Sequence, residues 1–236
     1  MEDCETRLRK LNDEYEEFAY IISHDLKAPV RAVNNLAAWL EEDLAGNLPG
    51  DSEENFRLLK NRVGRLDKMI SALLDFSRVT RYDLDVSETD ISALITSISQ
   101  SLEQEKSFTI QIEGEVPAIK TYAGKLGFVL RNLLQNAIFF NDKTRAEILV
   151  KLSEEKGNLK IEVEDNGPGV PEASLPKIFT MFYTAKPKDV SETTGAGLAI
   201  ANKIVNFAGG RLFAENITNG FRVTVSWPKI VQTAKD

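Results

Sequence analysis

Residues 18–33 read FAYIISHDLKAPVRAV. The apolar residues of this stretch recur at spacings of three and four, which predicts a stripe along an α-helix with the heptad pattern of a coiled coil. The stripe extends in both directions and comprises Leu8, Leu11, Tyr15, Phe18, Ile22, Leu26, Val30, Val33, Leu36, Leu40 and Leu44. Residues 46–52 then break the helix, and Asp51 or Ser52 is expected to cap a second one.

The second helix carries its own apolar stripe: Phe56, Leu59, Val63, Leu66, Ile70, Leu73 and Phe76. Two helices joined by a short turn predict an antiparallel hairpin. Because one hairpin buries little apolar surface by itself, we expect a homodimer in which two hairpins form a four-helix bundle.

Beyond Tyr82 the pattern changes to alternating strands and helices. Helices are predicted over 91–102, 122–140 and 197–207, and strands over 108–112, 148–152, 159–163, 210–214 and 221–227, with a hairpin turn at 154–158. This order predicts an α/β sandwich with a mixed sheet. The fold class is therefore α + α/β, with a domain boundary between residues 82 and 83.

Composition and charge exclude several classes of function. The 236 residues carry a net charge of -7, which argues against nucleic acid as a partner. The single cysteine fits a reducing compartment, and no apolar run approaches the roughly 18 residues of a membrane span. We expect a cytoplasmic location, with any upstream sensor domain absent from this chain.

His24 is the only histidine of the chain. It follows Ile22, which we expect in the core, by two positions, about 200° around the helix, so His24 should lie opposite the buried stripe and face solvent. Asp25 can hydrogen-bond one ring nitrogen and make the other more nucleophilic. Pro29 removes the amide partner of the Asp25 carbonyl and should bend the helix. By itself the pattern also fits an ordinary surface histidine.

Three further motifs carry polar residues or glycines. Asn132 and Asn136 are four residues apart and share a helix face, where an amide oxygen suits Mg²⁺ held together with phosphates. Asp165 ends a strand and precedes Gly167 and Gly169, a pattern that suits a flat base. Residues 193–200 put two glycines before a helix, where backbone amides can meet phosphate. Each motif alone also fits a polar helix face or a plain turn.

The order of these segments resembles that of bacterial two-component sensor histidine kinases, and the likeness covers nearly the whole chain. The matching segments are 18–33 with the histidine, 132–136 with the asparagines, 165–169, the phenylalanine segment 178–183 and the glycine segment 195–200. The resemblance implies a coiled-coil lead-in and a dimerisation and phosphoacceptor hairpin in residues 1–82. It implies an ATP-binding domain of the Bergerat type in residues 83–236.

The resemblance also implies roles for individual residues. His24 matches the phosphoacceptor, Asp25 its acidic partner and Asn136 the ligand of Mg²⁺, while Asn132 is implied in catalysis and in nucleotide binding. The remaining residues implied in ATP binding are Phe140, Asp165, Gly167, Gly169, Phe182, Lys186, Thr194, Gly195, Gly197 and Leu198. Residues 184–194 would form a lid. The implied partners are a second copy of the chain and the receiver domain of a response regulator.

Three departures from the family pattern bear on activity. Ala28 stands where many members have Thr or Asn, which puts phosphatase activity in doubt. Phe139 and Thr184 replace basic residues, and we hypothesise that Lys186 or Lys188 supplies the missing charge. Two alternatives remain: a catalytically weak dimeric scaffold, and an ATPase or serine kinase of the same nucleotide-binding family, which would have no use for His24.

Overall fold

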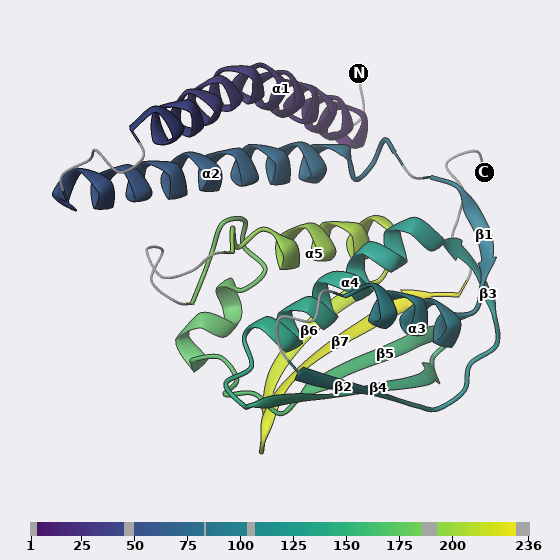
Figure 1. The fold of residues 1–236 in the computed structure, drawn as a ribbon. Helices are drawn as coiled ribbons and strands as arrows, with labels where there is room; N and C mark the ends of the chain where they lie inside the picture. Colours follow the sequence, from purple (N-terminus) through teal and green to yellow (C-terminus); the bar gives the residue numbers. More distant parts are fainter. Residues whose placement is uncertain (1–3, 45–49, 83, 103–106, 186–192, 230–236) are drawn as a thin grey trace. The chain divides into compact units, whose positions relative to one another are not determined.

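The computed structural model describes residues 4–44, 50–82, 84–102, 107–185 and 193–229. These residues form two compact units. The first contains α1 (Cys4–Leu44) and α2 (Gly50–Arg78), and the second begins at Val79 and contains every strand (Figure 1). The two units are described separately below.

Helix α1 runs without a break through Pro29, and its ribbon is arched along its length (Figure 1). The predicted bend is thus present as curvature and not as an interruption. Helix α2 begins at Gly50, so the expected cap residue Ser52 lies inside the helix. This prediction was wrong by about two residues, because the amides of a first turn have no partners within the helix and mark its start only weakly.

The two helices pack through side chains at seven-residue intervals. Ala72 and Leu74 of α2 are also buried, and the buried positions at seven-residue intervals are Ser23, Val30 and Ala37 in α1, and Val63, Ile70 and Ser77 in α2. The hairpin is antiparallel, since Lys60 near the start of α2 pairs with Glu41 near the end of α1. Small side chains at half of these positions let the helices approach closely.

Most of the apolar stripe predicted for α1 lies outside the face that packs against α2. Of that stripe, Val30 is buried, whereas Tyr15 is 63% and Phe18 62% exposed. Ile22, which was expected in the core, is 37% exposed, so that prediction is wrong for the single chain. The reason is physical: serine and alanine give no apolar signal in the sequence, although they form the seam against α2. The large apolar side chains remain on a second, exposed face.

The second unit is built on a five-stranded mixed sheet, as predicted. Its order is β2 (Ser107–Glu113), β4 (Arg145–Glu155), β5 (Asn158–Asp165), β7 (Gly220–Pro228) and β6 (Arg211–Ile217). The β2–β4 pair is parallel, and the other three pairs are antiparallel. A second sheet of β1 (Val86–Thr89) and β3 (Ile119–Tyr122) was not predicted, because strands of four residues show little periodicity.

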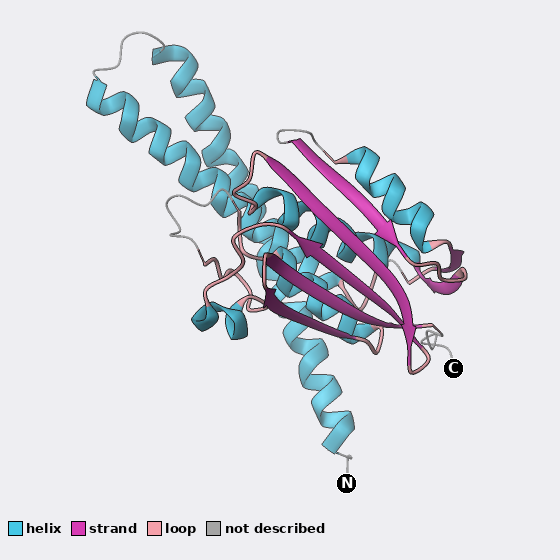
Figure 2. Cartoon of the chain, turned by 90° about the horizontal axis from the view of Figure 1, so that it is seen from below, coloured by secondary structure: helices cyan, strands magenta, loops and turns pink. Residues whose placement is uncertain are grey.

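Helices α3 (Ile91–Ser101), α4 (Ala123–Phe139) and α5 (Gly197–Phe207) agree with the predicted ranges. Figure 2 shows the five-stranded sheet with one face open, and α4 and α5 cover the other face. The core between these layers includes side chains less than 2% exposed: Leu126, Val129, Leu130, Leu134, Val150, Ile161, Val225 and Trp227. Burying each of the larger ones stabilises the fold by roughly 1.5–3 kcal/mol.

The turn between β4 and β5 is shorter than the predicted range of residues 154–158. Strands β4 and β5 leave only Lys156 and Gly157 in their turn, with φ of 51° and 83°. Positive φ at both residues is what a two-residue hairpin turn requires. A short 3-10 helix, η1 (Glu172–Lys177), was also not predicted.

Candidate functional site

His24 projects from α1 with its side chain 68% exposed, as predicted. Its Nδ1 atom lies 3.2 Å from Oδ1 of Asp25, so the acidic neighbour is in place. The imidazole is stacked with the ring of Tyr20, with centroids 6.3 Å apart and an angle of 25° between the planes. Because the carboxylate occupies the Nδ1 side, Nε2 is the nitrogen left for reaction with an electrophile.

The exposure of His24 follows from the burial of Ser23. Ser23 is fully buried, and its Oγ donates a hydrogen bond of 2.6 Å to the carbonyl of Ala19. Successive helical residues are about 100° apart, so a helix that turns Ser23 inward turns the next side chain outward. The orientation of the histidine is thus fixed by a residue that the apolar pattern did not identify.

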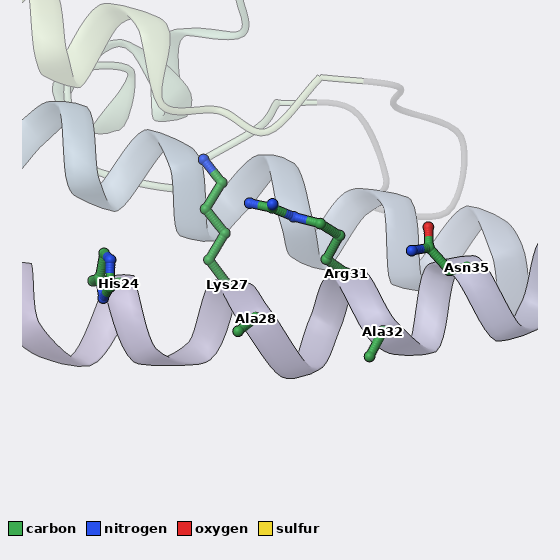
Figure 3. A pocket seen from close by; sticks show the side chains of 6 residues that line it. All are labelled: His24, Lys27, Ala28, Arg31, Ala32 and Asn35. Atoms are coloured by element: carbon green, nitrogen blue, oxygen red, sulfur yellow. The ribbon is translucent and has the colours of Figure 1, made fainter.

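Six residues on one side of α1 line a groove of about 460 Å³ (Figure 3). They are His24, Lys27, Ala28, Arg31, Ala32 and Asn35. The two alanines leave space beside the imidazole, and the two cations make that space attractive to an anion. At Ala28 the side chain is a methyl group, so it has no polar atom that could orient a water molecule.

Asp165 ends β5 and is held by the backbone that follows it. Its Oδ1 accepts a hydrogen bond of 2.8 Å from the amide of Gly167. Burial raises the pKa of Asp165, against hydrogen bonds from the amides of Gly167 and Phe221 that lower it. The start of β7 also needs glycine, since a Cβ on Gly220 would lie 1.6 Å from the Asp165 carbonyl oxygen. A half-buried acceptor is therefore fixed in direction at this strand end.

Two amides next to Asp165 were not identified from the sequence. Asn166 accepts hydrogen bonds through Oδ1 from Nδ2 of Asn141, at 2.7 Å, and from the amide of Glu147, at 3.0 Å. This connection ties the loop after β5 to the end of α4 and the start of β4. The sequence offered no signal for it, because the partners are 25 and 19 residues apart.

The first asparagine of α4 meets the second glycine segment. A Cβ on Gly197 would lie 2.3 Å from Oδ1 of Asn132, so a larger residue at the start of α5 would have to displace that side chain. Asn132 also donates a hydrogen bond of 3.0 Å to the carbonyl of Phe128. Asn136 is half-buried, and its amide makes no hydrogen bond to the described part of the chain. One amide is thus fixed by packing, and the next one along the helix is available to a ligand.

The loop that contains Gly169 is held by the side-chain amide of Asn216, a residue of β6. The φ of Gly169 is +73°, and a Cβ there would lie 2.6 Å from Oδ1 of Asn216. That oxygen accepts from the amide of Val170 at 2.9 Å, and Nδ2 of Asn216 donates to the Val170 carbonyl at 2.7 Å. Asn216, which sequence reasoning missed, therefore pairs with the loop backbone as a second strand would.

The structure gives the positions of most of the other residues implied in nucleotide binding. Phe140 is the C-cap of α4, and Phe182 has a φ of +62°, which is unusual for a bulky residue. Thr194 and Gly195 precede α5, with a φ of +71° at the glycine, and Leu198 is half-buried in its first turn. Lys186 and Lys188 lie outside the described residues.

The donor set fits a magnesium ion that is also held by phosphates. Among the described residues, no three His, Cys, Asp or Glu side chains cluster as a metal site would require. The neutral oxygen of Asn136 can supply one ligand, and Mg²⁺ takes its others readily from phosphate and water.

Membrane spans are a separate question. Among the described residues, no helix is both long enough and apolar enough to cross a membrane.

Two family models match the chain. Residues 14–81 match the His Kinase A (phospho-acceptor) domain, and residues 122–231 match the histidine kinase-, DNA gyrase B-, and HSP90-like ATPase family. The first model contains His24, and the second contains Asn132, Asn136 and Asp165.

Known proteins agree with these matches. Cyanobacterial phytochrome B of Nostoc sp. is 33% identical over 214 residues, which are 89% of this chain and 28% of that protein. Sensor protein ChvG of Agrobacterium fabrum is 29% identical over 253 residues, or 97% and 41% of the two chains. This chain thus spans less than half the length of either relative.

A solved structure supports the fold. The structure of histidine kinase ThkA in complex with response regulator protein TrrA has a TM-score of 0.64 and 20% identity. The match covers 96% of this chain and 66% of that one. At this identity the likeness concerns the arrangement of helices and strands.

Proposed function

The chain belongs to the two-component sensor histidine kinases as a catalytic core, and from this premise we propose that it phosphorylates its own His24 with ATP. In a second step it passes the phosphoryl group to an aspartate of a response regulator. The observation that carries the proposal is the exposed His24 imidazole with a carboxylate on Nδ1, in a chain that also matches an ATPase family.

The chemistry at His24 follows from its two ring nitrogens. With the proton on Nδ1 facing Asp25, the Nε2 lone pair attacks the γ-phosphorus of ATP. A P–N bond forms, the bond from phosphorus to the bridging oxygen breaks, and ADP leaves with that electron pair. The ring becomes positively charged, and Asp25 stabilises it or accepts the Nδ1 proton.

The nucleotide is assigned to the second unit. Asp165 accepts a hydrogen bond from the exocyclic amino group of adenine, and Gly167 and Gly169 let the loop backbone approach the base. Asn132, Gly195 and Gly197 bring polar groups to the phosphates at the start of α5. The family resemblance adds further residues to the proposed nucleotide-binding set, namely Phe140, Phe182, Lys186, Thr194 and Leu198.

Magnesium would be held by Asn136 and would neutralise charge on the phosphates. The division into a hairpin domain, residues 1–82, and an ATP-binding domain, residues 83–236, is part of the same proposal. Because the substrate is ATP, we place the core in the cytoplasm.

We assign the exposed apolar face of α1 to a second copy of the chain. Leu26, Val33 and Leu36 are 46%, 45% and 54% exposed, which is more apolar surface than a lone helix usually leaves in water. Pairing two hairpins would bury it in a four-helix bundle. We also assign a response regulator as a partner, because the histidine kinase ThkA, whose fold is similar, was solved in complex with response regulator protein TrrA. We place its docking site on the hairpin, since the hairpin carries His24.

Transfer of γ-labelled phosphate from Mg-ATP to the purified protein tests the proposal. Because His24 is the only histidine, label that is acid-labile, alkali-stable and absent from His24→Gln would identify the acceptor. Asp165→Asn is the matched control, since it should lose labelling through nucleotide binding. Label that persists in His24→Gln would refute the assignment.

A docking scaffold is the second candidate. It is favoured by Phe139, which is 46% exposed at the end of α4, and by Thr184, because the family resemblance implies a basic residue at each of these positions. The scaffold predicts dimerisation without labelling, even when ATP binds. Equilibrium binding of ATP measured beside the labelling assay separates the two.

A further inference from the structure

We propose that Tyr20 and Arg78 are positioning residues that hold the His24 imidazole in its reactive orientation. The inference rests on the proposed role of His24 as phosphoacceptor. It extends the site from one helix to two, because Arg78 is the last residue of α2.

The first observation is the stack of rings along α1. Tyr20 precedes His24 by four residues, so the two side chains lie on one face of the helix. Their planes are within 25° of parallel at a centroid distance of 6.3 Å, which is within the range of offset-stacked rings. Tyr20 is half-buried, whereas His24 is exposed, so the more restrained ring supports the freer one.

The second observation is the cation on the same tyrosine. The guanidinium carbon of Arg78 lies 5.1 Å from the centroid of the Tyr20 ring, inside the roughly 6 Å limit of a cation–π contact. Such a contact contributes more where water is partly excluded, and both side chains are half-buried. The end of α2 therefore fixes the ring on which the imidazole rests.

Two carboxylates lie near Arg78 and the His24 imidazole. Asp75 lies one turn before Arg78, and burial raises the pKa of its carboxyl group although the nearby charges of Arg78 and Lys27 lower it. Asp25 restrains the other edge of the imidazole, at 3.2 Å. A contact between two exposed groups holds its geometry only weakly. The stack on Tyr20 thus supplies the second restraint that the ring plane needs.

The functional consequence is a coupling between α2 and the nucleophile. In-line attack needs the Nε2 lone pair aligned, and a displacement of about 1 Å can cost up to about 100-fold in rate. If α2 shifts or rotates against α1, Arg78 leaves the Tyr20 face and the imidazole gains freedom. A signal that moves α2 would then change the reactivity of His24 without touching it.

The sole histidine makes the geometry measurable. In NMR spectra of protein that is isotope-labelled only at histidine, nuclear Overhauser effects should connect the ring protons of His24 with those of one tyrosine. We expect the contact to move to a phenylalanine ring in Tyr20→Phe and to vanish in Tyr20→Leu. Arg78→Gln should weaken it, whereas Arg57→Gln, which removes a cation paired with Glu54 on the same helix, should leave it intact.

Rates complete the test. Tyr20→Leu and Arg78→Gln should lower the autophosphorylation rate at saturating ATP by about 10- to 100-fold, with half-saturating ATP unchanged, and Tyr20→Phe should restore most of it. Absence of the Overhauser contact in the wild type, or a wild-type rate in Tyr20→Leu, overturns the inference. If the wild type takes no label at all, the proposed function fails, and the Overhauser contacts alone uphold or overturn the ring arrangement.

Discussion

Replacing Asp165 by asparagine should separate nucleotide recognition from stability. Asparagine keeps an oxygen that can accept from the Gly167 amide, now 2.8 Å from Oδ1. It removes the carboxylate proposed to accept from the adenine amino group. A hydrogen bond to a charged group is worth about 1.5–3 kcal/mol, so ATP affinity should fall by about 10- to 150-fold.

The fold itself should not suffer. Burial raises the pKa of Asp165, so folding favours its protonated form, and stability from this group is lost as pH rises through that raised value. At neutral pH the ionised carboxylate therefore destabilises the native state, and asparagine removes this penalty. The thermal midpoint of Asp165→Asn should equal or exceed that of the wild type at pH 7, and the gain should shrink as pH is lowered.

Calorimetric titration with ATP and with inosine triphosphate provides the assay. Inosine carries a carbonyl oxygen where adenosine has the amino group, so the wild type should prefer ATP. In Asp165→Asn the side-chain NH₂ can donate to that carbonyl, and the preference should vanish or reverse. Equal loss of both nucleotides in the variant, or an ATP affinity within about threefold of the wild type, would refute the assigned contact.

Three further substitutions test other parts of the second unit. Lys125→Met should lower the free energy of unfolding by about 2–4 kcal/mol, since Lys125 is 4% exposed and donates to the backbone carbonyls of Val79 and Tyr82. Urea denaturation measures this free energy, and a loss below about 1 kcal/mol contradicts the reasoning. Gly197→Ala should weaken ATP binding at least tenfold (~1.4 kcal/mol) by displacing Asn132, whose Oδ1 would lie 2.3 Å from the new Cβ, with an unchanged circular dichroism spectrum. Asn216→Ala should raise hydrogen exchange at the Val170 amide, because it removes both side-chain bonds to that residue, and Asn216→Asp should restore only the bond accepted from the amide.

Local periodicity was enough to predict most helices and strands of the chain. The ranges of α3, α4 and α5 agree with the structure because apolar residues at helical spacing were bounded by residues that end helices. The predicted strands also lie within β2, β4, β5 and β7. Strands β1 and β3 were missed, since four residues hold too little pattern to separate a strand from a loop.

The candidate site was predicted only where function depends on residue type. His24, Asp25, Asn136 and Asp165 were proposed as site residues because imidazole, carboxylate and amide groups stand in an order that resembles the family pattern. Asn216 was missed because its partner Val170 is 46 residues away, and no local signal predicts such a bond. Tyr20 and Arg78 are separated by 58 residues and meet only when the hairpin closes.

The sequence by itself determined the order of elements, the two-part organisation and the residues proposed to react, since these depend on spacing and chemistry along one chain. The tertiary structure decided which face of α1 meets α2. Ser23 and Ala37 are buried on this face because their side chains are small enough for the two helices to lie close together, and not because they are strongly hydrophobic. It also decided that Gly197 abuts Asn132 and that Asn216 holds the loop at Gly169, because such contacts arise only from packing between distant segments.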